Sequence, residues 1–197
     1  MKKLFVAVIA VFAFAGLARA EFGIGIKAGA VSAKGNTKDI YEANLNDTDT
    51  IEIPALLGFE GFFERAGGGL GVRVSAELAG SDRYEGYRGG RLYKDTVYTY
   101  KVPLTVYYKY GPLDSKFHFW AGGGATYMLV NYDDSNLSAN KVFPHVKGGV
   151  ECRFSRLFGL GLDVGYNFSA KTKATGAAKV YKDLTGIEGA VAARFYF

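Results

Sequence analysis

Residue types that commonly perform catalysis are scarce in this 197-residue sequence, which contains two histidines, His118 and His145, and one cysteine, Cys152. His145 is the only residue suited to act as a general base, but Val146 and Lys147 follow it, so no serine lies two residues further on. A single cysteine forms no internal disulfide, and the two histidines do not have zinc-site spacing. We therefore expect no enzymatic activity, no metal site and no cofactor.

Charged residues are more numerous, and they recur at alternate positions along several segments. On one phase of this alternation, seven basic residues share a face with seven acidic ones. The basic residues are Lys27, Arg73, Lys101, Lys109, Lys147, Arg153 and Arg194, and the acidic residues are Glu52, Glu60, Glu64, Glu77, Glu151, Asp163 and Glu188. Because unpaired charges in a confined interior are costly, equal numbers predict an internal network of salt bridges and hydrogen bonds. A solvated strand face with accidental charge balance is the alternative.

The elements that position these charges are predicted to be β-strands, because apolar residues alternate with glycine, polar or charged ones. The same period-two pattern gives eight segments, at approximately 21–33, 50–65, 69–80, 96–110, 116–132, 141–156, 158–169 and 184–197. The connections between them alternate between long and short, which places all the long loops at one end. This layout predicts an all-β fold, an eight-stranded antiparallel up-and-down transmembrane β-barrel.

The composition of the polar face indicates that lipid lies outside the barrel. Glycines such as Gly71 and Gly161 crowd that face, and an eight-stranded barrel has an interior only just wide enough for side chains. Aromatic residues gather at both ends of the apolar face, which is typical of membrane girdles. A soluble secreted barrel with its apolar face inside is the alternative.

Three prolines, Pro54, Pro103 and Pro144, interrupt the predicted strands. A closed barrel has no edge on which a missing N–H group is harmless. We therefore expect bulges or defects in the hydrogen-bond ladder at these positions.

The first twenty residues have the features of a secretory signal peptide. Two lysines precede an apolar run, and Ala18 and Ala20 supply the small residues of a cleavage site. We expect residues 1–20 to be removed and residues 21–197 to form the barrel domain. Loss of the two lysines and Arg19 would lower the net charge from +5 to +2. This removes the main support for nucleic-acid binding.

Two of the predicted long loops, 81–95 and 170–183, are basic. The binding candidates in the first loop are Arg83, Tyr84, Tyr87, Arg88, Arg91 and Tyr93. Arginine and tyrosine suit the recognition of anionic partners, so these residues predict contact with lipopolysaccharide, a surface glycan or a host protein. The simpler alternative is that adjacent loops pair with each other or are solvated.

Five inward-facing residues of low polarity are predicted to gather below the long loops: Leu56, Met128, Val130, Tyr132 and Phe143. They suggest a second function, a narrow channel or a binding site for a small hydrophobic molecule. Packing of these side chains under the loops is the simpler interpretation.

The final segment, 187–197, ends on alternating aromatic residues and a terminal phenylalanine. It resembles the C-terminal assembly signal of bacterial outer-membrane barrels, although Ala192 stands where that pattern prefers glycine. With the leader and eight segments, the chain resembles the small barrel family that includes OmpX, the OmpA barrel, Opa proteins and OmpW. The resemblance implies a Gram-negative outer-membrane protein with periplasmic termini and a structural or adhesive role. It also implies recognition of Phe195 and Phe197 by the barrel-assembly machinery.

Overall fold

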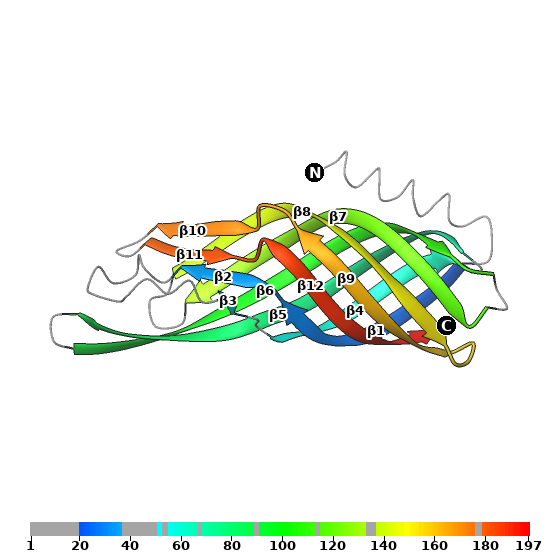
Figure 1. Cartoon of the computed structure of the whole chain (residues 1–197), viewed down its shortest axis with the longest axis horizontal. Helices are drawn as coiled ribbons and strands as arrows, with labels where there is room; N and C mark the ends of the chain where they lie inside the picture. The colour runs from blue at the N-terminus through cyan, green and yellow to red at the C-terminus, as the bar shows by residue number, and fades with distance from the viewer. Residues whose placement is uncertain are drawn as a thin grey trace.

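Eight antiparallel strands close into a barrel in the computed structural model, in the order β1-β12-β9-β8-β7-β6-β5-β4 (Figure 1). The structure describes residues 20–36, 51–52, 55–66, 68–88, 91–112, 115–132, 137–175 and 179–197. The barrel strands are β1 (Ala20–Val31), β4 (Ala55–Arg65), β5 (Gly69–Arg88), β6 (Arg91–Tyr110), β7 (Phe117–Tyr132), β8 (Leu137–Arg153), β9 (Phe158–Asn167) and β12 (Gly186–Tyr196). The predicted eight-stranded antiparallel barrel is confirmed. The predicted signal peptide lies outside the described residues, except for Ala20.

A second, four-stranded sheet lies beyond one end of the barrel (Figure 1). Its strands are β2 (Ala33–Asn36), β3 (Ile51–Glu52), β10 (Lys171–Thr175) and β11 (Lys179–Asp183), in the order β10-β11-β2-β3. The interpretation of 170–183 as a loop was therefore wrong, because most of this segment forms the antiparallel pair of strands β10 and β11. Residues 37–50, most of the predicted loop 34–49, lie outside the described part of the chain.

The predicted loop 81–95 was also wrong, because residues 81–88 and 91–95 continue the two neighbouring strands. Pairing of β5 with β6 runs from Arg83 opposite Thr96 to Arg88 opposite Arg91. Pairing of β6 with β7 begins only at Val97 opposite Tyr132. The distal parts of β5 and β6 therefore form a two-stranded ribbon that extends beyond the barrel (Figure 1). Likewise, β8 begins at Leu137, inside the predicted loop 133–140.

The opposite end of the barrel carries the short connections. The link from β4 to β5 contains Gly68, and β5 begins at Gly69. The φ angles of these two residues are +99° and +128°, which glycine adopts without strain. At the same end, the Phe197 N–H donates to the Phe22 carbonyl at 2.8 Å, so the last residue is joined to β1. We call this the short-turn end and the other the hairpin end.

The two faces of the barrel wall have reversed polarity compared with a water-soluble protein. Large apolar side chains cover the outer face, where Phe59, Tyr110 and Phe197 are 72%, 69% and 71% exposed. Charged side chains face inward and are buried. No helix in the described ranges is long and apolar enough to cross a membrane.

The β5–β6 ladder contains the defect expected at Pro103. It pairs Val74 with Leu104 and resumes at Glu77 opposite Lys101, so Pro103 has no described partner on β5. Pro144, in contrast, lies where β9 ends, and its carbonyl accepts the Phe168 N–H at 3.0 Å. Because no strand continues β9 beside it, the missing N–H of Pro144 disrupts little pairing. Pro54 lies outside the described residues.

Candidate functional site

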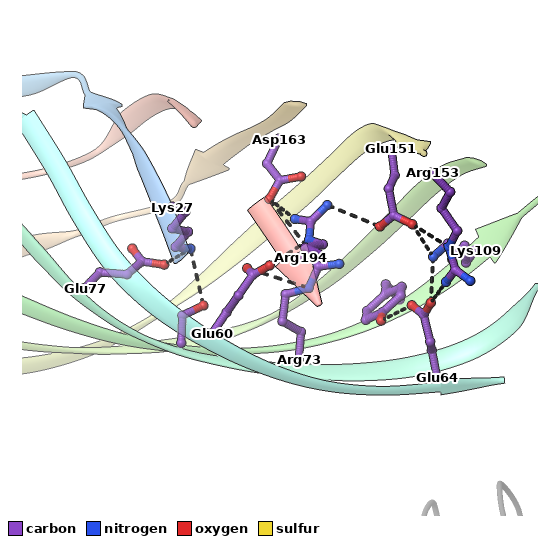
Figure 2. Close-up of polar contacts among 12 residues, drawn as sticks. Lys27, Glu60, Glu64, Arg73, Glu77, Lys109, Glu151, Arg153, Asp163 and Arg194 are labelled. Carbon is purple, nitrogen blue, oxygen red and sulfur yellow. Dashed lines mark hydrogen bonds and ion pairs between the residues drawn. The ribbon is translucent and has the colours of Figure 1, made fainter. Parts of the chain in front are cut away.

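The lumen of the barrel holds two clusters of ion-paired side chains. The structure places every charge predicted for the lumen there except Glu52, and each has an ion-pair partner. Most of these side chains are buried. They come from different strands around the wall, so the network joins opposite sides of the barrel across its interior (Figure 2).

The lysine cluster contains Lys27, Lys101, Lys147, Glu77 and Glu188. The Lys101 Nζ atom lies 2.6 Å from Glu188 and 3.0 Å from Glu77, and both carboxylates also contact a second lysine directly. The Asn167 side-chain amide donates to Glu188 at 2.9 Å. Three lysines and two glutamates give this cluster a formal charge of +1.

The arginine cluster lies nearer the short-turn end (Figure 2). It comprises Arg73, Lys109, Arg153, Arg194, Glu21, Glu60, Glu64, Glu151 and Asp163. Arg194 is its centre, with Nε donating to Glu60 at 2.6 Å, Nη2 donating to Asp163, and Nη1 lying 3.5 Å from Glu151. Four cations and five carboxylates give this cluster a formal charge of −1, which offsets the charge of the lysine cluster.

Glu21 belongs to the charged network, whereas Glu52, which the sequence interpretation assigned to the lumen, lies in another sheet. That prediction was wrong because the barrel strand β4 begins only at Ala55, and Glu52 belongs to β3 of the other sheet. Glu21 lies 2.8 Å from the Arg153 guanidinium. The period-two pattern of β1 could have identified it, because residue 21 shares the phase of Lys27.

Aromatic side chains surround the arginine cluster, and the sequence interpretation missed them. The Arg73 guanidinium carbon lies 4.4 Å from the ring centre of Trp120, 4.9 Å from that of Tyr107 and 5.6 Å from that of Phe62. Such contacts favour a cation at this position. The same alternation that predicted the inward charges would have placed these three rings inside.

Glycines on the inner face stand opposite the bulkiest lumen groups. A Cβ atom at Gly161 would collide with the Arg194 guanidinium, and one at Gly71 would lie 2.5 Å from the Tyr107 ring. Real Cβ contacts are not this short, so these positions accept only a hydrogen atom while their neighbours stay in place. The glycines therefore make room for the long side chains.

His145 is buried in the lumen between two threonine hydroxyls. Its Nε2 atom lies 2.9 Å from Thr105 Oγ1 and its Nδ1 atom 2.8 Å from Thr126 Oγ1. Both ring nitrogens therefore have hydroxyl partners, and the arrangement is that of a hydrogen-bonded structural histidine. The described residues contain no group of three or more His, Cys, Asp or Glu side chains that could hold a metal ion.

Apolar residues fill the lumen towards the hairpin end. Leu56, Met128, Val130 and Phe143 are at most 2% exposed, as expected for inward-facing residues. The side chain of Tyr132 lies outside the described part of the structure. These buried side chains therefore fill the lumen on the hairpin side of much of the charged network.

The six binding candidates Arg83, Tyr84, Tyr87, Arg88, Arg91 and Tyr93 lie on the β5–β6 ribbon. The backbone register places Arg88 directly opposite Arg91 and Tyr84 opposite Asp95. The structure thus brings these residues onto one pair of neighbouring strands beyond the barrel.

The sequence matches a family model described as "Outer membrane protein beta-barrel domain" over residues 4–195. No curated protein matches it. Among solved structures, the fold is similar to neisserial surface protein A, with a TM-score of 0.59 and 14% identity, over 89% of this chain and 97% of that one. It is also similar to Ail of Yersinia pestis, crystallised with the heparin analogue sucrose octasulfate, with a TM-score of 0.50 and 12% identity, over 90% and 98%. The Escherichia coli outer membrane protein W gives a TM-score of 0.47 and 19% identity, over 92% and 100%.

Proposed function

Because this chain belongs to the outer membrane protein β-barrel domain family, we propose that it acts at the cell surface through its hairpin end, where the β5–β6 ribbon binds anionic glycans. The chain is an outer-membrane protein. Its barrel would serve as a rigid, membrane-anchored support for the ribbon, with lipopolysaccharide sugars or host glycans as the partners.

The orientation we propose has the hairpin end outside the cell and the short-turn end in the periplasm. Barrels of the outer membrane have short periplasmic turns and longer extracellular connections. Aromatic residues near both ends of the outer face support this position in the membrane. Along β6, Tyr108 and Tyr110 lie near the short-turn end, and Tyr98 and Tyr100 lie towards the hairpin end. The ribbon beyond Tyr98 would then stand above the lipid.

The observation that carries this proposal is the direct cross-strand pairing of Arg88 with Arg91. Like charges directly opposite each other destabilise a β-ladder. A sequence that keeps two arginines at this position, next to further basic and tyrosine residues, is suited to an anionic partner that would neutralise them. Ail was crystallised with a sulfated sugar analogue, which agrees in chemistry with a polyanionic ligand for this chain.

A narrow channel or a small-molecule binding site receives less support. The lumen charges are paired with one another, and Met128 and Phe143 are fully buried. A planar-bilayer recording that showed stable conductance steps would favour the channel.

The test is binding of the refolded, detergent-solubilised protein to immobilised heparin. Replacing both arginines, R88E/R91E, should weaken binding by more than about tenfold, since charge-assisted hydrogen bonds contribute roughly 1.5–3 kcal/mol each. The matched control is R156E, because Arg156 is exposed at the short-turn end. Equal binding by R88E/R91E and the control would contradict the proposal.

A further inference from the structure

An open groove lies on the outside of the barrel at the short-turn end. Its volume is about 290 Å³, and it is lined by Gly68, Tyr108, Lys109, Tyr110, Gly111 and Pro112. These residues belong to the link between β4 and β5 and to the end of β6. A Cβ atom at Gly68 would lie 2.9 Å from the Lys109 carbonyl oxygen, so the two segments are in close contact at the groove.

Two tyrosine side chains and the protein backbone form the walls of this groove. Tyr108 and Tyr110 are 59% and 69% exposed on the outer face. The Lys109 side chain is buried in the lumen, so its backbone is the part that lines the groove. Tyrosines near the end of a membrane barrel place their rings against lipid chains and their hydroxyl groups among the headgroups. The groove therefore faces the headgroup region of one leaflet.

Arg65 is the basic side chain beside the groove. It is exposed at the end of β4, and its Cδ atom lies 3.1 Å from the point that a Cβ of Gly69 would occupy. Gly69 follows Gly68 and pairs with Lys109 in the ladder, so the stem of Arg65 lies along the border of the groove. No carboxylate in the described part of the chain forms an ion pair with Arg65.

The charge of the short-turn end indicates the kind of partner. Among the described side chains of this end, the exposed charged ones are all basic, namely Arg65, Lys116 and Arg156. The carboxylates described there already have cationic partners: Glu21 and Glu64 pair with Arg153, and Glu151 pairs with Lys109. The exposed side chains at this end therefore complement an anion.

We propose that the groove binds the headgroup of an anionic phospholipid from the leaflet at the short-turn end. The Arg65 guanidinium donates hydrogen bonds to the lipid phosphate, and such charge-assisted bonds are stronger than neutral ones. The volume suits a headgroup, because pockets for whole drug-sized ligands measure about 300–1,000 Å³. The acyl chains of the same lipid lie along exposed apolar residues such as Leu70, which pairs with Tyr108. This site goes beyond the proposed surface function, because it does not involve the ribbon.

The test places a fluorescent probe beside the groove without changing the residues that line it. L70W is refolded into vesicles of phosphatidylcholine and phosphatidylglycerol, in which either lipid carries brominated chains that quench an indole on contact. The wild type, whose only tryptophan is the buried Trp120, gives the background to subtract. We expect about a fivefold preference for phosphatidylglycerol, since a basic residue near a lipid surface contributes about 1 kcal/mol. Equal quenching by the two lipids would overturn the proposal.

Two matched variants, R65A and R156A, each combined with L70W, test the location. Both remove one exposed arginine from the short-turn end, but only Arg65 borders the groove. The preference for phosphatidylglycerol should disappear in R65A and remain about fivefold in R156A. An unchanged preference in R65A would refute the site. Equal losses in both variants would also refute it, because they would show a general attraction of anionic lipid to the basic end of the barrel.

Discussion

Individual lumen charges are held by several partners, so the cost of a substitution depends on which charges it leaves unpaired. Glu77, for example, lies among Lys27, Lys101 and Lys147. Its carboxylate and that of Glu188 together offset three ammonium groups. Removing one carboxylate would leave Glu188 as the only acid of the cluster.

We expect E77A to destabilise the barrel by about 3–5 kcal/mol, the cost of breaking a buried ion pair by removing one partner. Urea-induced unfolding in detergent, followed by Trp120 fluorescence, measures this. The control is K171A, because the Lys171 side chain is 63% exposed and pairs with Asp183 at 3.5 Å. Such exposed pairs contribute about 0–1 kcal/mol. If E77A and K171A unfold alike, the lumen network does not stabilise the barrel.

Two glycines give a matched comparison of the inner and outer faces. Gly161 faces the Arg194 guanidinium, whereas a Cβ at Gly61 would meet nothing within 4 Å. We expect G161A to lose about 1–3 kcal/mol through overpacking, and G61A to change stability by about 0.5 kcal/mol or less. The same unfolding assay compares them, and equal effects would show that the lumen tolerates extra volume at this position.

At the scale of strands, β12 has a structural role and a proposed assembly role that can be separated. Its end is joined to β1 through the backbone of Phe197, while the Phe197 ring points to the outer face. The backbone hydrogen bond therefore does not need the ring. We propose that the barrel-assembly machinery recognises Phe195 and Phe197, and this recognition would need their rings.

We expect F197A to refold in detergent as the wild type does but to reach the outer membrane of cells in several-fold lower yield. Quantifying the protein in outer-membrane fractions measures the yield. F154A is the control, since Phe154 is a similarly exposed aromatic residue at the short-turn end, at 64%. A normal yield of F197A in the outer membrane of cells would contradict the proposed role of Phe197 in assembly.

Among the described barrel strands, the pairing of β5 with β6 has the most irregularities in its hydrogen-bond ladder. Pro103 interrupts it, and its register shifts between Leu78 and Ser81, next to Gly80 with φ of +77°. Bulges of this kind bend a strand and increase its twist. Beyond this point the two strands leave the wall as the ribbon, so the irregular segment marks the change from barrel to hairpin.

At the scale of the whole molecule, closure is the feature that distinguishes a barrel from an open sheet. β1 pairs with both β12 and β4, so the ladder has no free edge from which to open. A closed ladder with a buried ionic network should resist SDS at room temperature. We therefore expect the protein in outer-membrane fractions to migrate differently on SDS gels before and after boiling.

A heat-dependent shift in mobility would agree with the closed barrel. Recovery of the protein in the soluble fraction without a shift would contradict the assignment of the apolar face to lipid. E77A is a useful companion sample, because its shift should occur at a lower temperature than that of the wild type.

The sequence alone determined what depends on local alternation. Period two identified the barrel strands, the inward phase of the charges and the outward phase of the aromatic residues of the girdles, because successive side chains in a strand point to opposite faces. The sequence also predicted an outer-membrane barrel, because its final segment, 187–197, ends on alternating aromatic residues. Charge balance predicted pairing, but not which residues pair.

Only the tertiary structure decided the partners and the limits of the strands. Arg194 meets Glu60 across 134 positions of sequence, because closing the barrel brings β12 and β4 to either side of β1. Glu21 rather than Glu52 completes the network, because the chain leaves the barrel for a second sheet before Glu52. The arginine-rich segment is a paired ribbon because each strand supplies the other's hydrogen bonds, a property that composition does not reveal.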